Sequence, residues 1–566
     1  MSTSPASADT AASAALRPDD PGTPRHRVAI VTLGCGRNEV DSDQLAGLFH
    51  LEGVEVIDDP AEAEVVLVNT CTFIAPAKQE SVDTVLEACD LKGPDGTARA
   101  VLVVGCMAER YPDELAEAIP EADAIVGFDG YARLPALVDD VLAGRPYQRV
   151  ATAKPAAPVG RPGLPTLSLT PVTAESPHGD VLPADAAPPP LDPDLALGLS
   201  VDELPPEAPR ATADHATAQD DLDRVPATGP RFPIRRHDGR PWAYLKLASG
   251  CDRLCTFCAI PSFRGRFRSR PLDELRAEAE WLVGQGAREL VLVSENTTSW
   301  GKDLDGGRDG QAAMVEALAD TDGLQRLRLM YLQPAELTNR LLETIAGHPN
   351  VASYFDLSLQ HVSGPVVRRM ARSGDHERFG RLIERIRELD PHAAFRSNFI
   401  LGFPGETEDD VRVLEEFLIA HQLDWVGLFA YSPEDGTSAA TMPDQVDPGE
   451  AAERVERVSE LQDRLADAAA ARYVGRDLTV TVEEHVTEGG TGTEGATAGD
   501  GLVLTSARSY REAPDTDGEV QLIGPDGEPA DLPRGRTVTA RVVDTDGVDL
   551  VAVPAGPGHD GDRGRG

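Results

Sequence analysis

The chain has 566 residues, 41% of them hydrophobic, and a formal net charge of -42 at pH 7. A chain of this length folds into about three or four domains, and its hydrophobic fraction is high enough for buried cores, which excludes a wholly disordered protein. The acidic balance argues against capture of nucleic acid by the whole surface, because phosphate contacts need clustered Lys and Arg, although a local basic groove stays open.

Residues 1–25 are polar and rich in Ala, Ser and Pro, without the basic start and apolar centre of a secretory signal, so we predict a disordered tail. No apolar run approaches the ~20 residues of a membrane helix. The seven cysteines are an odd number, which favours free or metal-bound thiolates in a reducing compartment over a disulfide framework. We therefore expect a cytoplasmic protein with no membrane attachment, and a monomer as the default.

From residue 26 to 148, apolar stretches bounded by Gly or turn residues alternate with stretches of helical periodicity. The apolar stretches predict buried strands over 27–34, 64–70, 99–105 and 123–127. The stretches that follow them predict helices over 41–53, 76–90, 111–119 and 134–144. Strand–helix alternation of this kind predicts an α/β domain with a doubly wound parallel sheet.

Residues 149–236 interrupt this pattern with Pro-rich acidic segments such as DAAPPPLDPD and DELPPEAPR. Proline at this density removes backbone donors and stops both helices and sheets. We interpret the segment as a long flexible insertion without chemistry of its own. The alternative is a small partner-binding segment.

Alternation resumes over 237–471. Six strands are predicted, over 242–250, 288–296, 326–332, 354–360, 394–402 and 425–431, with helices between them such as 272–286 and 376–389. Six such units predict an open, partial (β/α)6 barrel whose site lies at the C-terminal ends of the strands. A long charged helix is expected next, over 449–475.

The C-terminal part contains short strand patterns separated by Gly and Asp turns, over 477–485, 501–510, 519–524, 536–546 and 549–555. We expect a small all-β barrel over 472–555 and a loose tail over 556–566.

The sharpest chemical signal is GCDRLCTFCAIPSFRGRFRSRP, in which Cys251, Cys255 and Cys258 have the spacing C-x-x-x-C-x-x-C. Thiolates are soft ligands that suit iron or zinc. A cubane cluster has four irons, so three local cysteines leave one iron open to a small molecule unless a remote residue supplies the last ligand. The loop follows the first barrel strand, where active sites lie. The alternatives are a three-thiolate zinc site or reduced structural cysteines.

A second cysteine set occurs in the N-terminal domain, where Cys35, Cys71 and Cys106 each follow a predicted strand. The C-terminal ends of parallel strands share one sheet edge, so these three thiolates can converge there. Three converging thiolates would hold another cluster with an open iron. The alternative is that they are ordinary buried cysteines. Cys89 lies on a predicted helix and is interpreted as an ordinary helix cysteine.

The Cys251 loop resembles the radical S-adenosylmethionine superfamily, and both cysteine sets followed by a β-barrel resemble its methylthiotransferase family. The resemblance covers nearly all of the ordered chain. It implies a 4Fe–4S cluster with S-adenosylmethionine on Cys251, Cys255 and Cys258, an auxiliary 4Fe–4S cluster on Cys35, Cys71 and Cys106, and a C-terminal TRAM domain. In this family one cluster generates the radical, the auxiliary cluster delivers sulfur, and S-adenosylmethionine also supplies the methyl group.

The same resemblance implies further cofactor-binding residues, which are Phe257, Ser294, Glu295, Arg396, Gly402 and Gly405. Ser294 and Glu295 end the second barrel strand, where the family contacts the amino group and ribose of the cofactor. The alternatives are structural: a loop or capping acid for Glu295, a salt bridge inside the barrel for Arg396, and a helix-start turn for the glycines. The family implies no catalytic residue beyond the cluster ligands.

The substrate could belong to either of two branches of the family. From Arg472 to the end the chain has nine Arg, no Lys and eighteen Asp plus Glu, a net charge of -9, whereas a barrel that grips RNA should be basic. The motif ARSYREAPDTDG (507–518) also resembles the branch that methylthiolates an aspartate of small-subunit ribosomal protein number twelve. We expect that substrate, with Tyr510 and Arg511 facing it. The alternative is that Tyr510 packs the barrel and Arg511 pairs with an acid.

Two other functions stay as alternatives. One is methylthiolation of a modified adenosine in transfer RNA, and the other is a non-enzymatic iron–sulfur scaffold or redox sensor. The family resemblance also implies an electron donor such as flavodoxin or ferredoxin. Two departures from the family pattern are the long insertion and Gly36-Arg37, which stands where a Pro-Lys pair is common.

Overall fold

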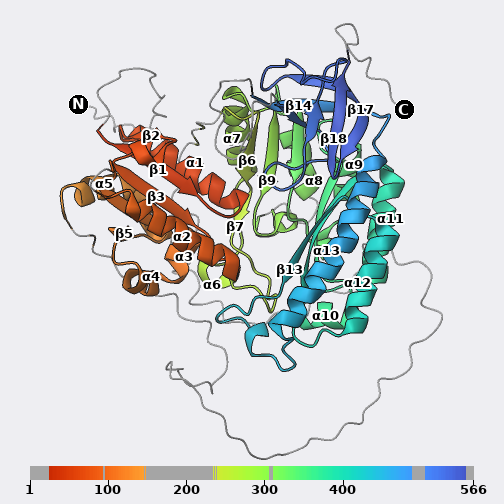
Figure 1. The fold of residues 1–566 in the computed structure, drawn as a ribbon, viewed down its shortest axis with the longest axis horizontal. Coiled ribbons are helices and arrows are strands. Elements are labelled where there is room, and N and C mark those ends of the chain that lie inside the picture. The colour runs from red at the N-terminus through yellow and green to blue at the C-terminus, as the bar shows by residue number, and fades with distance from the viewer. Residues whose placement is uncertain are drawn as a thin grey trace, which may run out of the picture.

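The computed structural model describes residues 25–93, 96–145, 147, 234, 236, 239–304, 310–486 and 504–555. These residues form an N-terminal domain, a central barrel and a C-terminal barrel in chain order (Figure 1). The tail predicted over 1–25 and the insertion predicted over 149–236 lie outside the described residues, apart from Arg25, Ile234 and Arg236. The predicted tail over 556–566 lies outside them as well.

The N-terminal domain has a parallel sheet in the order β2-β1-β3-β4-β5, with strands β1 (Arg27–Thr32), β2 (Glu55–Ile57), β3 (Val65–Thr70), β4 (Ala100–Val104) and β5 (Ala124–Ile125). Its helices are α1 (Gly36–Leu51), α2 (Ala75–Asp90), α3 (Gly105–Arg110), α4 (Pro112–Ala118) and α5 (Leu134–Leu142), with short 3-10 helices over Pro60–Glu62 and Phe128–Arg133.

Successive residues of β3 enter two different cores, Val65 and Leu67 on one face and Val66 and Val68 on the other. Helices therefore cover both faces of this sheet, which confirms the predicted doubly wound α/β domain. The edge strand β2 was not predicted, because a short half-exposed Glu-Val-Ile segment has no distinct periodicity.

The central barrel is built from six parallel strands, β6 (Trp242–Lys246), β9 (Glu289–Val293), β10 (Arg326–Leu329), β11 (Tyr354–Gln360), β12 (Ala394–Leu401) and β13 (Trp425–Ala430). They form two three-stranded sheets, β10-β9-β6 and β11-β12-β13, joined by isolated bridges at Leu327 with Val351 and Leu332 with Leu357. Strands β6 and β13 stand at the two ends of this row, so the barrel is open, as the sequence predicts.

The barrel helices are α6 (Ile260–Arg264), α7 (Leu272–Gly284), α8 (Gly310–Ala319), α9 (Asn339–Gly347), α10 (Gly364–Arg369), α11 (His376–Leu389), α12 (Glu408–His421) and α13 (Pro448–Ala471). A small hairpin pairs β7 (Ala248–Ser249) with β8 (Arg268–Ser269), and 3-10 helices cover Thr297–Ser299, Pro334–Glu336 and Ala439–Thr441. The start of α12 is fixed by a capping box between Thr407 and Asp410.

The C-terminal barrel closes through β14 (Asp477–Val486), β15 (Leu504–Arg508), β16 (Val520–Leu522), β18 (Asp549–Pro554) and β17 (Thr537–Asp546), with β17 pairing back to β14. Alternate residues such as Val480, Val482 and Val542 fill its interior, and Tyr473 at the end of α13 packs on the same core. The small all-β barrel expected from the sequence is therefore confirmed.

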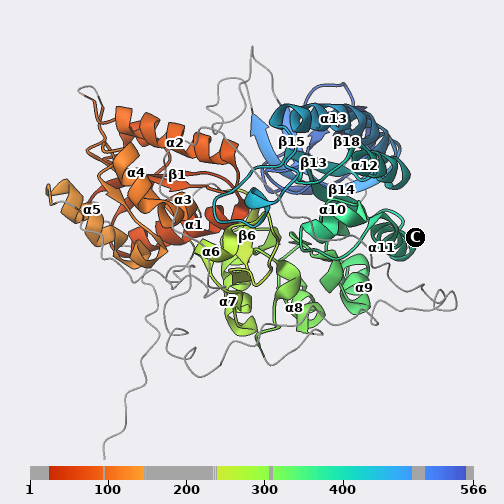
Figure 2. The ribbon, with the colours of Figure 1, turned by 90° about the horizontal axis from the view of Figure 1, so that it is seen from below.

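The N-terminal domain and the C-terminal barrel contact different parts of the central barrel (Figures 1 and 2). Helix α1 packs against β6, and its Asp41 pairs at 2.7 Å with Lys246, the last residue of that strand. The C-terminal barrel contacts the opposite strand ends, where Arg326 at the start of β10 donates to the Arg508 carbonyl at 3.3 Å. No helix in the part of the chain that the structure describes is long and apolar enough to cross a membrane.

Candidate active site

The three N-terminal cysteines lie along one edge of the parallel sheet. Cys35 is the N-cap residue of α1 after β1, Cys71 directly follows β3, and Cys106 lies in the first turn of α3 after β4. Strands β1, β3 and β4 are adjacent and parallel, so their three loops meet at the C-terminal edge. A Cβ atom on Gly34 would lie 2.8 Å from the Cys71 Sγ, which places the Cys35 loop against Cys71.

Asn38 ties these loops together from the first turn of α1. Its Nδ2 donates to the carbonyl oxygens of Leu33 at 2.8 Å and Thr70 at 3.2 Å. Its Oδ1 lies 3.6 Å from the Cys106 Sγ, and its own carbonyl accepts from the Asn69 Nδ2 at 2.9 Å. This fully buried side chain therefore contacts all three cysteine loops.

The pKa values of these thiols depend on burial, on the neighbouring thiols and on two nearby arginines. Burial, with a smaller contribution from neighbouring Cys35, raises the pKa of Cys71 to about 11. Burial also raises the pKa of Cys106, which the Arg264 guanidinium partly offsets. Burial opposes ionisation of Cys35 too, but Arg37 and Arg264 bring its pKa below the usual value. Three such thiols need added positive charge to ionise together, and the irons of a cluster would supply it.

The second cysteine set lies in the loop that follows β6 and β7. Cys251, Cys255 and Cys258 are all half-buried. Gly250 precedes them with a φ of +78°, and a Cβ atom there would overlap the Arg266 carbonyl, so this turn requires glycine. Burial raises the pKa of Cys251 to about 11 and of Cys258 to about 12, and the neighbouring thiols add to both shifts.

Neither set is arranged to chelate one metal ion. Among the described residues, no group of three or more Cys, His, Asp or Glu side chains is placed to hold a single ion. A cubane cluster puts each thiolate on a different iron, so its ligands surround a volume instead of a point. Each set also has an arginine donor that suits an anionic cluster: Arg37 donates to the Cys35 Sγ at 3.2 Å and Arg372 to the Cys255 Sγ at 3.3 Å. The residues therefore fit clusters better than a zinc site.

Two arginines link the two cysteine sets across the domain interface. Arg37, from the N-terminal domain, donates to the Ser294 carbonyl of the central barrel at 3.4 Å. Arg264, from the barrel loop after Cys258, donates to the Cys106 Sγ of the N-terminal domain at 3.1 Å. Each of these arginines thus crosses from the domain of one cysteine set to the domain of the other.

The predicted cofactor residues Ser294 and Glu295 lie at the C-terminal end of β9. The Ser294 Oγ accepts from the Asn296 amide at 3.2 Å. The Glu295 side chain is only 1% exposed, and the Arg264 guanidinium lies 3.7 Å from its Oε1. Neither carboxylate oxygen of Glu295 has a hydrogen-bond partner among the described residues. A buried carboxylate without donors is costly, so this position fits a ligand that brings amino or hydroxyl donors.

Arg396 lies inside the barrel on β12. It contacts Asp356 of β11 and Asp517 of the C-terminal barrel, both at 3.3 Å. Asp356 also accepts from the Tyr331 amide at 2.8 Å, and the Tyr331 ring lies 5.0 Å from the Arg37 guanidinium. Arg396 therefore makes the salt bridges that were the structural alternative for it, in a series of contacts that leads toward the cysteine edge.

The remaining predicted cofactor residues contact other parts of the protein. Gly402 and Gly405 both have a φ of +76°. A Cβ atom on Gly402 would overlap Ala451 of α13, and one on Gly405 would overlap the Arg369 guanidinium. Chain conformation and packing thus already require glycine at both positions. Phe257 packs on a small apolar cluster that includes Phe403.

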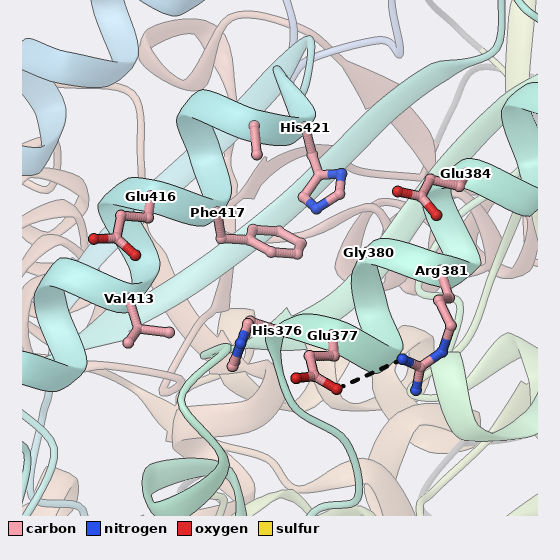
Figure 3. A pocket seen from close by; sticks show the side chains of 10 residues that line it. His376, Glu377, Gly380, Arg381, Glu384, Val413, Glu416, Phe417 and His421 are labelled. Atoms are coloured by element: carbon pink, nitrogen blue, oxygen red, sulfur yellow. Dashed lines mark ion pairs between the residues drawn. The ribbon is translucent and has the colours of Figure 1, made fainter. Parts of the chain in front are cut away.

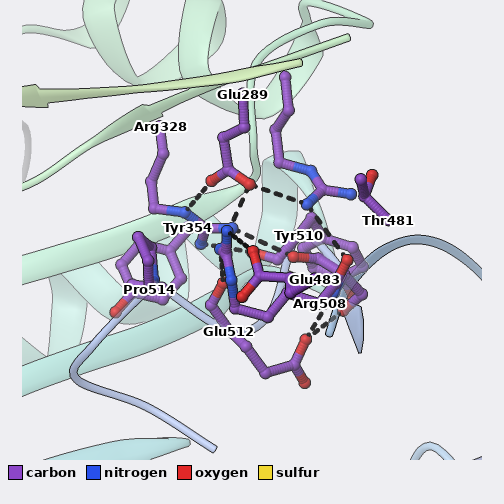
Figure 4. Close-up of polar contacts among 12 residues, drawn as sticks. Glu289, Arg328, Tyr354, Thr481, Glu483, Arg508, Tyr510, Glu512 and Pro514 are labelled. Atoms are coloured by element: carbon purple, nitrogen blue, oxygen red, sulfur yellow. Dashed lines mark hydrogen bonds and ion pairs between the residues drawn. The ribbon is translucent and has the colours of Figure 1, made fainter. Parts of the chain in front are cut away.

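The prediction that Arg511 faces an incoming protein is wrong. Its side chain is fully buried, lies over the Trp425 ring at 4.3 Å and pairs with Glu512 at 3.0 Å. Tyr510 is partly buried and donates from its hydroxyl to the His392 carbonyl at 2.8 Å. The ARSYREAPDTDG loop packs against the central barrel, where Arg508 of the loop contacts Glu289 at 3.2 Å and Arg328 donates to the Tyr510 carbonyl at 2.7 Å (Figure 4).

Sequence reasoning missed the polar residues that hold the two domains together. The Lys246 Nζ lies 2.7 Å from Asp41, which Arg264 also contacts at 3.2 Å. Glu434, which follows β13, pairs with Lys78 at 3.0 Å and Arg110 at 2.8 Å. Asn38 and Asp41 lie one helical turn apart just after Cys35, and this spacing could have indicated that both side chains face the cysteine edge. Their partners in the central barrel could not be predicted, because they lie far along the chain and come close only when the domains pack together.

A groove of about 300 Å³ lies on the outside of the central barrel, between α11 and α12. Figure 3 shows His376, Glu377, Phe417 and His421 among its lining residues. None of its lining residues belongs to the predicted site, so this groove has no part in the arrangement described above.

Three family models match the chain: Uncharacterized protein family UPF0004 over residues 27–127, the Radical SAM superfamily over 245–418, and the TRAM domain over 474–554. The "Ribosomal protein uS12 methylthiotransferase RimO" of Streptomyces avermitilis is 44% identical over 532 residues, covering 94% of this chain and 97% of that protein. The protein of the same name from Saccharopolyspora erythraea is 45% identical over 540 residues, covering 95% and 97%. The chain belongs to the radical S-adenosylmethionine methylthiotransferase family.

This confirms the family and the fold class predicted from the sequence. Membership of the radical S-adenosylmethionine superfamily implies a 4Fe–4S cluster and S-adenosylmethionine as cofactors. Among solved structures, the radical S-adenosylmethionine methyltransferase TsrM of Kitasatospora setae, with tryptophan substrate and an S-adenosylmethionine analogue bound, is 16% identical. Its TM-score is 0.45, with coverage of 78% of this chain and 90% of that chain.

Proposed function

We propose that this protein replaces a hydrogen on the β carbon of an aspartate in ribosomal protein uS12 with a methylthio group. The observation that carries the proposal is 44% identity to a relative named uS12 methylthiotransferase over 94% of this chain and 97% of that protein. Because the match covers all three domains, it supports the whole activity and not the radical step alone.

The central barrel supplies the radical step. Cys251, Cys255 and Cys258 would hold the cluster that binds S-adenosylmethionine, and this pair supplies a 5′-deoxyadenosyl radical when bound. Arg372 orients Cys255 through its contact with the thiol. Glu295 would accept hydrogen bonds from amino or hydroxyl groups of the cofactor, which would satisfy its buried oxygens. Ser294 and Phe257 flank the same edge, whereas Arg396 acts from inside the barrel through Asp356.

The N-terminal domain supplies the sulfur. Cys35, Cys71 and Cys106 would hold a second 4Fe–4S cluster, which supplies or carries the sulfur to be inserted. Asn38 keeps the three loops together, and Arg37 and Arg264 stabilise thiolate charge at Cys35 and Cys106. The contact between the two domains keeps the sulfur source beside the site where the substrate radical forms. When bound, S-adenosylmethionine would supply both the radical and, as a second equivalent, the methyl group, with electrons from a donor of the flavodoxin or ferredoxin class.

The acidity of the C-terminal barrel supports a basic protein substrate over a polyanionic RNA. Its segment carries a net charge of -9 from Arg472 onward, which repels phosphate and attracts a basic ribosomal protein. The buried Arg511 removes one of the positive charges that RNA could have contacted.

Mass spectrometry of ribosomal proteins and transfer RNA from cells with and without this protein tests the proposal. We expect the uS12 peptide to lose a methylthio group, about 46 Da, when the protein is absent. An unchanged uS12 peptide with loss of the group from transfer RNA would contradict it.

A further inference from the structure

Arg264 contacts both candidate sites at once, although neither the cysteine spacing nor the family resemblance pointed to it. It ends α6, the short helix after Cys258, and only 3% of its side chain is exposed. Its Nη2 donates to the Cys106 Sγ at 3.1 Å and to the Asn38 Oδ1 at 2.9 Å. Its Nη1 lies 3.7 Å from the Glu295 carboxylate.

The surroundings of Arg264 fix its position. The guanidinium lies 4.9 Å from the centre of the Phe128 ring and pairs with Asp41 at 3.2 Å. Asp41 is in turn held by Lys246 at 2.7 Å. The Nη2 nitrogen makes the contacts with Cys106, Asn38 and Asp41, while the Nη1 nitrogen lies beside Glu295. The two arms of one planar, always charged guanidinium thus reach both sides at once.

The residue also differs from the other buried cations at this interface. Arg110 is 7% exposed and pairs with Glu434 at 2.8 Å, but it makes no contact with a cysteine sulfur. Arg37 contacts Cys35 from within the same domain and loop. Arg264 alone among the described residues carries a hydrogen bond to a cysteine sulfur across the boundary between the two domains.

We propose that Arg264 couples the two sites, by positioning Cys106 and by raising the reduction potential of a cluster held by Cys35, Cys71 and Cys106. The inference rests on the proposed second cluster. Reduction adds one electron to that cluster without making or breaking a covalent bond. A buried positive charge and an N–H···S hydrogen bond stabilise the added negative charge, so they raise the potential. Arg264 is a positioning residue in this account.

The test uses the full chain with Cys251, Cys255 and Cys258 all changed to Ala, so that only the N-terminal set can hold a cluster. After anaerobic reconstitution, the parent should bind about four irons. The midpoint potential is then measured by reductive titration with dithionite, followed by electron paramagnetic resonance. Three further variants are compared on this background: R264Q, R264K and R110Q.

We expect R264Q to bind iron with a lower midpoint potential than the parent, because it loses both the charge and the fork. R264K keeps the charge and should fall between the two. R110Q also loses a buried arginine at the interface, but its potential should equal that of the parent. If R264Q fails to bind iron, the midpoint potentials of R264K and the parent are compared instead, and equal values would overturn the inference.

Equal potentials in the parent and R264Q, both loaded with iron, would overturn the inference and leave the second cluster standing. An equal fall in R110Q would also overturn it, since interface loosening would then explain the shift. A parent that binds no iron would instead refute the second cluster itself, and the inference with it. These three results are distinguishable by iron content and potential alone.

Discussion

Two glutamates stand at opposite ends of β9, and their surroundings differ sharply. Glu289, at the start of the strand, accepts from Arg328 at 2.7 Å, Arg326 at 3.1 Å and Arg508 at 3.2 Å (Figure 4). Glu295, just beyond the end of the strand, is equally buried, yet its oxygens have no hydrogen-bond partner among the described residues. The first carboxylate joins two barrels, whereas the second forms an ion pair, in the part of the chain that the structure describes, only with the Arg264 guanidinium at 3.7 Å.

The pKa of Glu289 shows that its three arginines more than offset the effect of burial. Burial alone would raise it, but Arg508, Arg328 and Arg326 bring it down to about 2. The difference teaches that burial and residue type do not separate a structural acid from a functional one. The number of cations and donors that the fold itself provides does separate them.

The largest effect is expected from substitution of the cysteines at the C-terminal ends of the strands, near Glu295. Cys251→Ala should abolish cleavage of S-adenosylmethionine, because the cluster of the central barrel loses a ligand. Changing Cys35, Cys71 and Cys106 together to Ala should leave that cleavage intact and stop sulfur insertion. Formation of 5′-deoxyadenosine and of methylthiolated product, measured side by side in reduced protein, separates the two steps. A mutant without the N-terminal set that still makes methylthiolated product would refute this division.

The second prediction concerns Glu289, at the start of β9. E289Q leaves three buried arginines around a neutral amide, so we expect the free energy of unfolding to fall by about 3–5 kcal/mol. Denaturant unfolding of the full chain measures it. The control is E316Q, which breaks a half-exposed pair with Arg340 at 3.5 Å and should cost less than about 1 kcal/mol. Similar losses in both variants would contradict the structural role of Glu289.

The same carboxylate predicts an acid dependence. Its folded pKa, about 2, lies below the ordinary value of 4.5, so its contribution to stability is present above pH 4.5. That contribution should be lost as the pH falls from 4.5 through 2. Unfolding curves across this range should therefore fall more steeply for the natural chain than for E289Q, and parallel curves would contradict the assignment.

The smallest effect sharpens the comparison at Glu295. E295Q should weaken S-adenosylmethionine binding by about ten- to a hundredfold, since one charge-assisted hydrogen bond is worth roughly 1.5–3 kcal/mol. Unfolding stability should change less than in E289Q, because Glu295 pairs with only one arginine, Arg264 at 3.7 Å, and accepts no hydrogen bond among the described residues. Equilibrium binding to reconstituted protein measures the affinity, and E316Q, which changes a half-exposed glutamate, is the control. Unchanged affinity in E295Q would show that Glu295 does not contact the cofactor.

Much of the fold could be predicted from the sequence, because the buried strands are continuous apolar runs and the helices between them have a helical periodicity. Apolar strands such as 64–70 and 288–296 are buried on both faces and need no partner to be recognised. The cysteines were equally visible, since their place after each strand follows from local sequence. Edge strand β2 was missed because three half-exposed residues carry no pattern.

The residues that the sequence did not reveal are those whose partners lie far along the chain. Arg264 meets Cys106, and Arg511 lies over Trp425, through contacts that only the packing of domains creates. A Tyr-Arg pair in a polar loop predicts an exposed surface, whereas here aromatic rings and acids of both barrels bury the arginine. Long-range ion pairs of this kind have no signature in spacing or periodicity.

The central claim is tested most directly by offering both substrate classes to the same enzyme. Reduced, reconstituted protein is incubated with S-adenosylmethionine, uS12 and transfer RNA together, and both products are analysed by mass spectrometry. We predict a gain of about 46 Da on one aspartate of uS12, with the transfer RNA unchanged. A gain on transfer RNA with uS12 unmodified would contradict the account.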